Sequence, residues 1–443
     1  MPHRRSRFRP GQSQDRHPVA PGKPLSRAQR RRFCFPPGRP ALYRAALSGE
    51  RRHRRLAAVA VFVGIGFSLS YFFFSAFSPS SAISVLNYFL QVEAGSAIPA
   101  LSVKKRASKS KALSRGFRVV ALGGGTGLST LLRGLKELVI RRIDERASPE
   151  RPIADLAAIV TVTDDGGSSG RLRRENRILP PGDIRNCMVA LSKDEALLGR
   201  LFQYRFHAGR GLIGHNFGNL FLAALTHVTG DFTEAIRVSS KVLAIRGRIF
   251  PSTLSNVHLV AKLENGRTVH GETRITASRS PIKTLSLSPR RVRPLPKAIE
   301  AIKQADLILL GPGSLYTSIL PNLMIPEIAS AIAKSKAPRV YVANLMTQPG
   351  ETSGYALADH LRAIQTHVRH RVIDWVVANR QAVSPEVARR YRAQGAEPVD
   401  IDLGQLQKLG FRVILDNLLE EHGVIRHRTQ RLSRLLLEEF LHR

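Results

Sequence analysis

The sequence predicts an α/β protein built on a doubly wound, mostly parallel sheet with helices on both faces and a helical and hairpin insertion. Three observations within residues 116–430 predict it: short, nearly continuous apolar runs, glycine-rich loops directly after several of them, and helical spacing between them. Strands of a parallel sheet are covered on both faces, so they are apolar throughout. Ligands of such sheets bind outside the carboxyl ends of the strands, where these loops fall.

The first unit is a strand at residues 118–122, a glycine-rich loop at 123–127 and a helix at 128–139. Backbone N–H groups at the start of such a helix can hold a diphosphate, with Thr126 or Ser129 adding a hydroxyl. The loop lacks the lysine of a Walker motif and the third glycine of a dinucleotide fingerprint. A purely structural tight turn is therefore the alternative.

The second unit places two adjacent carboxylates after a strand at residues 157–163. Glycines in the run T-D-D-G-G-S-S-G-R let a phosphate or a metal ion approach the backbone. Asp165 is the candidate ligand residue, either for a sugar hydroxyl or for Mg²⁺ with ligand phosphates completing the coordination shell. The alternative, helix capping or an Asx turn, applies more readily to Asp164.

A long helical region is predicted at residues 183–243. Asp183 follows Pro-Pro-Gly and is expected to cap the first helix, and Arg185 in its first turn reaches either a phosphate or a surface salt-bridge partner. Asn219 belongs to a polar cluster before an apolar helix, which suits anion or base recognition or simple capping. The sequence shows no serine with an evident histidine partner, and His215 lacks neighbours at metal-ligand spacing.

An antiparallel excursion follows the helical region. Residues 257–263 and 268–275 flank the Asn265-Gly266 dipeptide, a strong signal for a hairpin turn. Both segments are therefore predicted as strands.

Three more parallel strands are expected, at residues 306–310, 339–343 and 371–377. The first leads into a second phosphate-type loop, which begins at Gly311 and contains Gly313 and Ser314. A polar loop at residues 344–352 follows the next strand. The loops after residues 122, 163 and 310 are predicted to form a three-sided nucleotide site at adjacent strand ends.

The first 115 residues differ from the rest in charge. They hold 22 Lys and Arg against 3 Asp and Glu, whereas the remaining 328 residues hold 47 against 30. Residues 1–55 are predicted as a basic disordered leader, 56–77 as an uncharged apolar segment long enough for a transmembrane helix, and 78–115 as a basic linker. A genuine anchor that contacts acidic lipids and an upstream reading-frame artefact are both open.

The excess of Lys and Arg over Asp and Glu favours anionic partners, but the main domain has no recognised nucleic-acid module. Only Cys34 and Cys187 are present, without a C-x-x-C companion, so a disulfide framework is not expected and a reducing cytoplasm fits. Cys187 is predicted as a small buried side chain. Residues 431–443 are predicted as a C-terminal helix.

Six motifs resemble, in order, those of the gluconeogenesis factor (YvcK-like) family, which is related to 2-phospho-L-lactate transferase (CofD-like). They cover about residues 117–430 and read R-V-V-A-L-G-G-G-T-G-L-S, T-D-D-G-G-S-S-G-R-L-R, P-P-G-D-I-R-N, G-H-N-F-G-N-L, G-P-G-S-L-Y-T-S-I-L-P-N-L and N-L-M-T-Q-P-G-E-T. The resemblance implies a Rossmann-like fold and ligand contacts by Tyr391 and Arg426. It also implies that the nucleotide lies against Gly124, Gly125, Thr126, Asp165, Gly311, Gly313 and Ser314. An aromatic ring and a guanidinium suit a uracil or sugar face and a diphosphate.

The resemblance leaves two functions open. The first is a cytoplasmic, homo-oligomeric regulator that binds UDP-N-acetylglucosamine or UDP-glucose without turnover, contacts a cell-wall enzyme or regulator, and supports cell shape and wall synthesis on gluconeogenic carbon sources. The second is a Mg²⁺-dependent transferase, in which a substrate hydroxyl attacks an activated phosphate and Asp165 holds the metal ion. Specific nucleic-acid binding is not expected. If the leader is genuine, residues 56–77 anchor the domain in a membrane.

Overall fold

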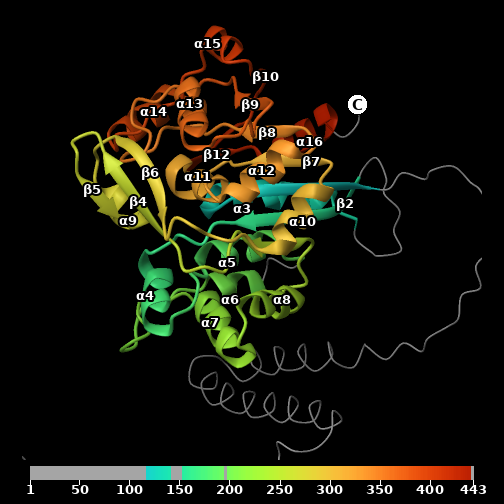
Figure 1. Cartoon of the computed structure of the whole chain (residues 1–443), viewed down its shortest axis with the longest axis vertical. Coiled ribbons are helices and arrows are strands. Elements are labelled where there is room, and N and C mark those ends of the chain that lie inside the picture. The colour runs from blue at the N-terminus through green and yellow to red at the C-terminus, as the bar shows by residue number, and fades with distance from the viewer. Residues whose placement is uncertain (1–115, 141–151, 194–196, 441–443) are drawn as a thin grey trace, which may run out of the picture. The chain divides into compact units, whose positions relative to one another are not determined.

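The computed structural model describes residues 116–140, 152–193 and 197–440 (Figure 1). The predicted leader, transmembrane segment and linker lie outside the described residues. Among the helices that it does describe, none is long and apolar enough to cross a bilayer.

Seven parallel strands form the central sheet, in the order β10-β9-β8-β7-β1-β2-β3. Successive side chains of a strand point to opposite faces, yet Val119, Val120, Ala121 and Leu122 of β1 are all buried. Both faces of the sheet are therefore covered, which confirms the predicted α/β class. The strands are β1 Phe117–Gly123, β2 Ile153–Val160, β3 Arg248–Pro251, β7 Leu307–Leu310, β8 Arg339–Val342, β9 Trp375–Asn379 and β10 Arg412–Asp416.

The strand order reverses between β1 and β7. From β1 the chain continues to β2 and β3 on one side, and from β7 it continues to β8, β9 and β10 on the other. Loops that leave the two central strands turn in opposite directions, so a crevice forms outside their carboxyl ends. The reversal therefore predicts where a ligand binds before any side chain is considered.

Helices connect and cover the strands. Helix α3 packs against α5 and α16, and α10 packs against α12. The predicted C-terminal helix begins earlier than expected, and its Leu432, Leu435 and Leu436 join the main core. The helices are α3 Gly125–Leu135, α4 Gly167–Asn176, α5 Gly182–Leu191, α6 Leu197–Gln203, α7 Phe217–Thr229, α8 Phe232–Val242, α9 Glu272–Ala277, α10 Pro296–Gln304, α11 Leu320–Leu323, α12 Pro326–Lys334, α13 Leu357–His367, α14 Pro385–Arg392, α15 Leu403–Lys408 and α16 Thr429–Phe440, with short turns η3 Lys136–Leu138 and η4 Leu315–Ile319.

The antiparallel excursion is a three-stranded sheet in the order β5-β4-β6. Strands β4 (His258–Leu263) and β5 (Thr268–His270) form the predicted hairpin, and β6 (Ile282–Ser288) pairs on the other side of β4. The predicted second strand, residues 268–275, is wrong beyond His270, because Gly271 turns the chain at a φ of 90° and α9 follows. Apolar residues such as Ile275 then enter the core from a helix.

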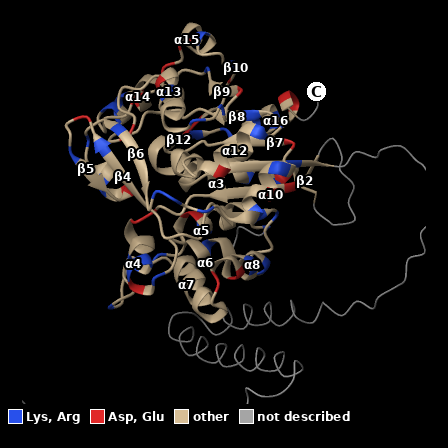
Figure 2. Cartoon of the chain, in the orientation of Figure 1, with Lys and Arg blue, Asp and Glu red and all other residues tan. Residues whose placement is uncertain are grey.

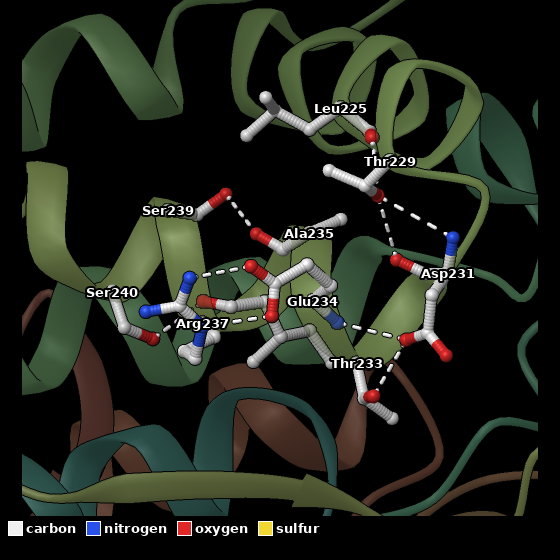
Figure 3. Close-up of polar contacts among 10 residues, drawn as sticks. Leu225, Thr229, Asp231, Thr233, Glu234, Ala235, Arg237, Ser239 and Ser240 are labelled. Atoms are coloured by element: carbon white, nitrogen blue, oxygen red, sulfur yellow. Dashed lines mark hydrogen bonds and ion pairs between the residues drawn. The ribbon is translucent and has the colours of Figure 1, made fainter. Parts of the chain in front are cut away.

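The turn between α7 and α8 is closed by its own side chains (Figure 3). Asp231 caps α8: its Oδ1 accepts hydrogen bonds from the Glu234 N–H at 2.8 Å and from the Thr233 hydroxyl at 2.5 Å. The Gly230 N–H donates to the Thr226 carbonyl at 2.9 Å and ends α7. Local hydrogen bonds therefore satisfy the helix ends at this turn.

Candidate functional site at the carboxyl ends of the strands

Three loops meet at the point where the strand order reverses. They follow β1, β2 and β7, which are neighbours in the sheet, as the sequence predicts. The Thr161 N–H donates to the Gly123 carbonyl at 3.0 Å, and the Gly311 N–H donates to the Leu122 carbonyl at 2.9 Å. The loops therefore start from one continuous ladder of backbone hydrogen bonds.

In the first loop, glycine is required by both space and conformation. A Cβ on Gly124 would lie 2.6 Å from Asp183 Oδ2 and 2.7 Å from Thr161 Cγ2, and Gly125 has a φ of 61°. The predicted Thr126 is exposed. The neighbouring Ser129 and Thr130 hydroxyls are occupied, because both donate to the Thr126 carbonyl. Thr126 is thus the loop hydroxyl that faces solvent.

The expected role of Asp183 as a helix cap is wrong. Helix α5 begins at Gly182 after Pro181, without a side-chain cap. The Asp183 carboxyl group instead lies against Gly124 and accepts a hydrogen bond from the Gly125 backbone. Burial, followed by the negative charge of Asp164, raises the pKa of Asp183 to about 7. The sequence could not predict this because Asp183 and Gly125 are distant in the chain.

The two adjacent aspartates after β2 have different partners. Asp164 Oδ1 accepts the Gly166 N–H at 2.9 Å, which is the Asx turn considered from the sequence. Asp165 Oδ1 accepts the Thr273 N–H at 2.9 Å and the Thr273 hydroxyl at 2.7 Å. Asp165 therefore caps α9 and joins the β2 loop to the three-stranded sheet, a tertiary contact that local sequence patterns do not contain.

The second glycine loop is held by the polar loop after β8. The Gly313 N–H donates to Asn344 Oδ1 at 3.1 Å, and Asn344 Nδ2 donates back to the Gly313 carbonyl at 2.9 Å. The Ser314 hydroxyl donates to Gln348 Oε1 at 2.6 Å. Sequence reasoning noted this polar loop but gave Asn344 and Gln348 no role. The one signal for them was their position just after a predicted strand.

Buried Glu351 holds the segment that follows the same loop through hydrogen bonds. It accepts hydrogen bonds from the Thr317 hydroxyl at 3.0 Å, the Tyr316 N–H at 3.2 Å and the Thr276 hydroxyl at 3.3 Å. Burial raises the pKa of this carboxyl group. Glu351 thereby ties α9 to the segment that follows Ser314, and it positions the second loop.

Arg185 and Asn219 lie together where α4, α5 and α7 begin. A Cβ on Gly218 would lie 2.8 Å from Arg185 Cδ, so the arginine side chain crosses the first turn of α7. The Asn219 amide faces Ser169, with Nδ2 3.5 Å from Oγ. Asn216 supplies the helix cap, because its Oδ1 accepts the Gly218 N–H at 3.0 Å. Capping therefore does not explain Asn219.

A serine and a histidine do meet, contrary to the sequence interpretation. Ser168 Oγ lies 3.0 Å from His215 Nδ1, and both side chains are buried. The Asn216 N–H also donates to Ser168 Oγ, at 3.3 Å. Burial and the nearby charge of Arg171 lower the pKa of His215. The pair joins the starts of α4 and α7, whose residues are too far apart in sequence to be recognised as partners.

Tyr391 and Arg426 are brought to one place by the hairpin of β11 (Leu419–His422) and β12 (Val424–His427). The Ile425 N–H donates to the Tyr391 hydroxyl at 2.9 Å, and Arg426 beside it is exposed. His427 Nε2 is 3.1 Å from the Ala343 carbonyl, which fixes β12 at the carboxyl end of β8. Both residues therefore lie near the carboxyl end of β8.

Comparisons with known proteins identify the family. The family model described as 2-phospho-L-lactate transferase CofD matches residues 119–419. The chain is 47% identical to the gluconeogenesis factor of Bacillus subtilis over 322 residues, which are 72% of this chain and 97% of that protein. It is 46% identical to the gluconeogenesis factor of Halalkalibacterium halodurans over 321 residues, 72% of this chain and 95% of that protein. The chain belongs to the gluconeogenesis factor family.

A solved structure agrees with this membership. The crystal structure of a UPF0052-family protein from Bacillus halodurans has a TM-score of 0.68 and 46% sequence identity, and the match covers 73% of this chain and 99% of that one. The gluconeogenesis factor fold is thus the one described above.

In this member of the gluconeogenesis factor family, charge at the site is mixed. Figure 2 shows Lys and Arg spread over many elements instead of gathered on one. At the strand ends, burial and the charges of Asp164 and Asp183 raise the pKa of Glu272. Burial and Arg205 lower the pKa of Arg185 to about 10. Carboxyl groups therefore gather at the phosphate-type loop, and guanidinium groups gather beside the start of α7.

Proposed function

We propose that the domain binds a UDP-sugar, UDP-N-acetylglucosamine or UDP-glucose, at the β1/β7 reversal. The observation that carries the proposal is the convergence of the glycine loop at the start of α3 with the second loop after β7. The start of α3 and the Thr126 hydroxyl hold the diphosphate. Gly313 and Ser314 form the opposite wall. Tyr391 and Arg426 contact the uracil or sugar face and a phosphate.

Mg²⁺ is part of this proposal. The fit is chemical: Mg²⁺ binds through one or two carboxylates and completes its shell with water and substrate phosphates. Asp164 and Asp165 are adjacent carboxylates beside the loop. Burial first, and then negative charge led by that of Asp164, raises the pKa of neighbouring Glu272. Bound there, Mg²⁺ would neutralise charge between these carboxylates and the diphosphate. Asp165 would serve through Oδ2, the carboxylate oxygen to which Thr273 does not donate.

The biological role that we propose is regulation without turnover. UDP-sugars are precursors for wall synthesis, so a cytoplasmic protein that senses them can adjust cell shape and wall synthesis on gluconeogenic carbon sources. Its protein partner would be a cell-wall enzyme or regulator, and the chain would act as a homo-oligomer. The support is family membership together with the three loops that meet where the strand order reverses.

Calorimetry of the full chain with UDP-N-acetylglucosamine and with UDP-glucose tests this function. We expect saturable binding of one of them, with Mg²⁺ present, and no consumption of the ligand. Thr126→Ala and Tyr391→Ala should each weaken binding, whereas Lys408→Ala, at the end of α15, serves as a surface control. A folded chain that binds neither nucleotide sugar would overturn the proposal.

A second function, phosphoryl-type transfer, is favoured by one observation. Asp183 is a carboxyl group with a pKa of about 7 beside the phosphate-type loop, which suits a general base near neutral pH. In such a reaction the acceptor hydroxyl oxygen bonds to phosphorus, the bond from phosphorus to the leaving phosphate breaks, and the acceptor proton passes to Asp183. ³¹P NMR of the chain with UDP-N-acetylglucosamine, Mg²⁺ and an alcohol acceptor distinguishes the two functions, because only transfer joins the sugar phosphate to the acceptor and releases UMP.

A further inference from the structure

A groove lies between α13 and strand β6 of the three-stranded sheet. Its volume is about 470 Å³, which falls within the range of small-molecule sites, about 300–1,000 Å³. Residues of β6, of α13 and of the turn before α13 line it. The Leu285 N–H of β6 donates to His367 Nε2 of α13 at 2.9 Å, so a hydrogen bond joins these two elements. The groove is therefore built by tertiary packing.

Three rings form the aromatic part of the lining. The ring centroids of Tyr316 and Tyr355 are 6.4 Å apart at an interplanar angle of 69°, and those of Tyr316 and His367 are 5.8 Å apart at 86°. Ala363 of α13 adds an apolar surface beside them. Aromatic rings pack favourably against one another edge to face or offset. The groove therefore suits a ligand with an aromatic body.

The two tyrosine hydroxyls leave one proton for a ligand. Their oxygens are 2.9 Å apart, and one hydrogen bond between them uses only one of the two hydroxyl protons. Burial, followed by the hydrogen bond to Tyr355, raises the pKa of Tyr316, so its hydroxyl keeps its proton. The charges of Glu351 and Glu264 act in the same direction, and neither of these residues lines the groove. The pair therefore donates to an additional acceptor.

The carboxylate and the imidazole of the lining are already engaged as acceptors. Asp359 Oδ1 accepts a hydrogen bond from Arg362 Nη1 at 2.9 Å, and Asp359 Oδ2 accepts the Ala356 N–H at 3.0 Å. His367 Nδ1 lies 2.8 Å from the Ala363 carbonyl, so Nδ1 donates there while Nε2 accepts from β6. Neither group is therefore left to accept from a ligand.

Donors of the lining, in contrast, remain available. Lys283 and Ser353 line the groove and are exposed, and in the part of the chain that the structure describes neither side chain has a hydrogen-bond or ion-pair partner. Arg362 uses one donor on Asp359 and one on Gln405, and a guanidinium has five. A surface with more donors than acceptors and an unpaired ammonium group suits an anion.

We propose that this groove binds an aromatic carboxylate. The Lys283 ammonium and the remaining tyrosine hydroxyl proton hold the carboxylate oxygens. The ring of the ligand packs against Tyr355 and Ala363. The site goes beyond the proposed function, because none of the residues assigned to the UDP-sugar lines the groove.

Titration of the full chain with benzoate, benzamide and acetate, followed by ¹H NMR of each probe, tests the site. Benzamide has the ring without the charge, and acetate has the carboxylate without the ring. We expect saturable binding of benzoate, about tenfold or more tighter than binding of either other probe. Benzoate that binds no more tightly than benzamide or acetate would overturn the site.

Lys283→Met separates the charge from the ring. It should weaken benzoate by about tenfold and leave benzamide unchanged, since it removes only the charged donor. Lys262→Met is the matched control, because it removes the same charge from β4 of the same sheet but lies outside the lining. Equal affinities of Lys283→Met and Lys262→Met for benzoate would contradict the assignment.

Ala363→Leu fills the groove from α13. We expect it to abolish binding of benzoate, whereas Gln365→Leu, which is exposed on the same helix outside this lining, should retain it. Thermal midpoints show whether both variants fold. If Ala363→Leu does not fold, Lys283→Met on the exposed rim still decides, and a folded Ala363→Leu that binds benzoate at full affinity would place the ligand elsewhere.

Competition distinguishes the groove from the nucleotide site. We expect benzoate to bind to the chain saturated with UDP-N-acetylglucosamine as well as to the chain alone. Mutual exclusion would mean that benzoate occupies the nucleotide site, which overturns the proposal. If the chain binds benzoate but neither nucleotide sugar, the proposed function fails and this site stands.

Discussion

Two sets of helix starts in the same helical region are built differently. At the α7–α8 turn, Asp231 supplies the acceptor for α8, and the Glu234 N–H and the Thr233 hydroxyl donate to it (Figure 3). At the starts of α4 and α5, glycine and proline supply no side-chain acceptor, and buried Asn219 and Arg185 keep unpartnered atoms among the described residues. Local side chains therefore satisfy the first set, whereas at the second set the acceptor for the Gly166 N–H comes from Asp164 in the preceding loop and two buried polar atoms stay unpartnered among the described residues.

Gly182→Ala, at the start of α5 in the second set, should lower the free energy of unfolding more than the other substitutions below. The new Cβ would overlap Ser169 Oγ and lie 3.0 Å from Asp164 Oδ2. We expect a loss of about 1–3 kcal/mol of unfolding free energy and weaker ligand binding. Gly404→Ala is the matched control, because this first-turn glycine of α15 has only a side-chain oxygen within reach, at 3.3 Å. Chemical denaturation of both variants measures the difference, and equal losses would contradict the prediction.

Asp183→Asn tests the carboxyl side of the site through pH. The pKa of Asp183 is raised to about 7, so below that pH the group is neutral and above it the group is negative beside the phosphate-type loop. Affinity for UDP-N-acetylglucosamine without Mg²⁺ should therefore fall about tenfold between about pH 6 and about pH 8. The asparagine variant should show a flat profile in calorimetry. A profile that keeps its slope would assign the titration to another group.

Asp231→Ala should remove a cap and nothing else. Loss of the Glu234 and Thr233 hydrogen bonds is expected to cost about 1 kcal/mol, seen as a lower thermal midpoint. Asp231→Asn, which retains an acceptor oxygen, should restore most of it. Ligand affinity should stay at the level of the unaltered chain in both variants, because this turn belongs to the first set. A large loss of affinity would remove the distinction between the two sets.

Ser240→Ala should have the smallest effect. The Ser240 hydroxyl donates to the Ile236 carbonyl one turn back at 2.7 Å, a bond that duplicates an acceptor already used by the helix. Alanine has the better helix propensity, so the change in unfolding free energy should stay within about 0.5 kcal/mol. Denaturation midpoints measure it, and a loss as large as that of Asp231→Ala would show that side-chain bonds inside α8 matter as much as its cap.

The sequence by itself determined the parallel sheet, the glycine loops after β1 and β7, and the Asn265-Gly266 hairpin. Each rests on a local pattern, an apolar run or a turn dipeptide, that requires one backbone conformation. Local patterns did not predict β3 and β10. Both lie at the edges of the sheet, and β10 is only partly buried, so neither stands out as a central strand.

Only the tertiary structure decided which hydrogen-bond partners the side chains of the site have. Asp183 turns to Gly125 instead of capping α5, Asp165 caps α9, and Asn344 holds Gly313. Ser168 and His215 meet although the sequence separates them. These contacts join residues that follow different strands, and their geometry depends on which strands are neighbours in the sheet. Sequence patterns identified many of these residues, whereas the packing of elements distant in sequence determined their hydrogen-bond partners.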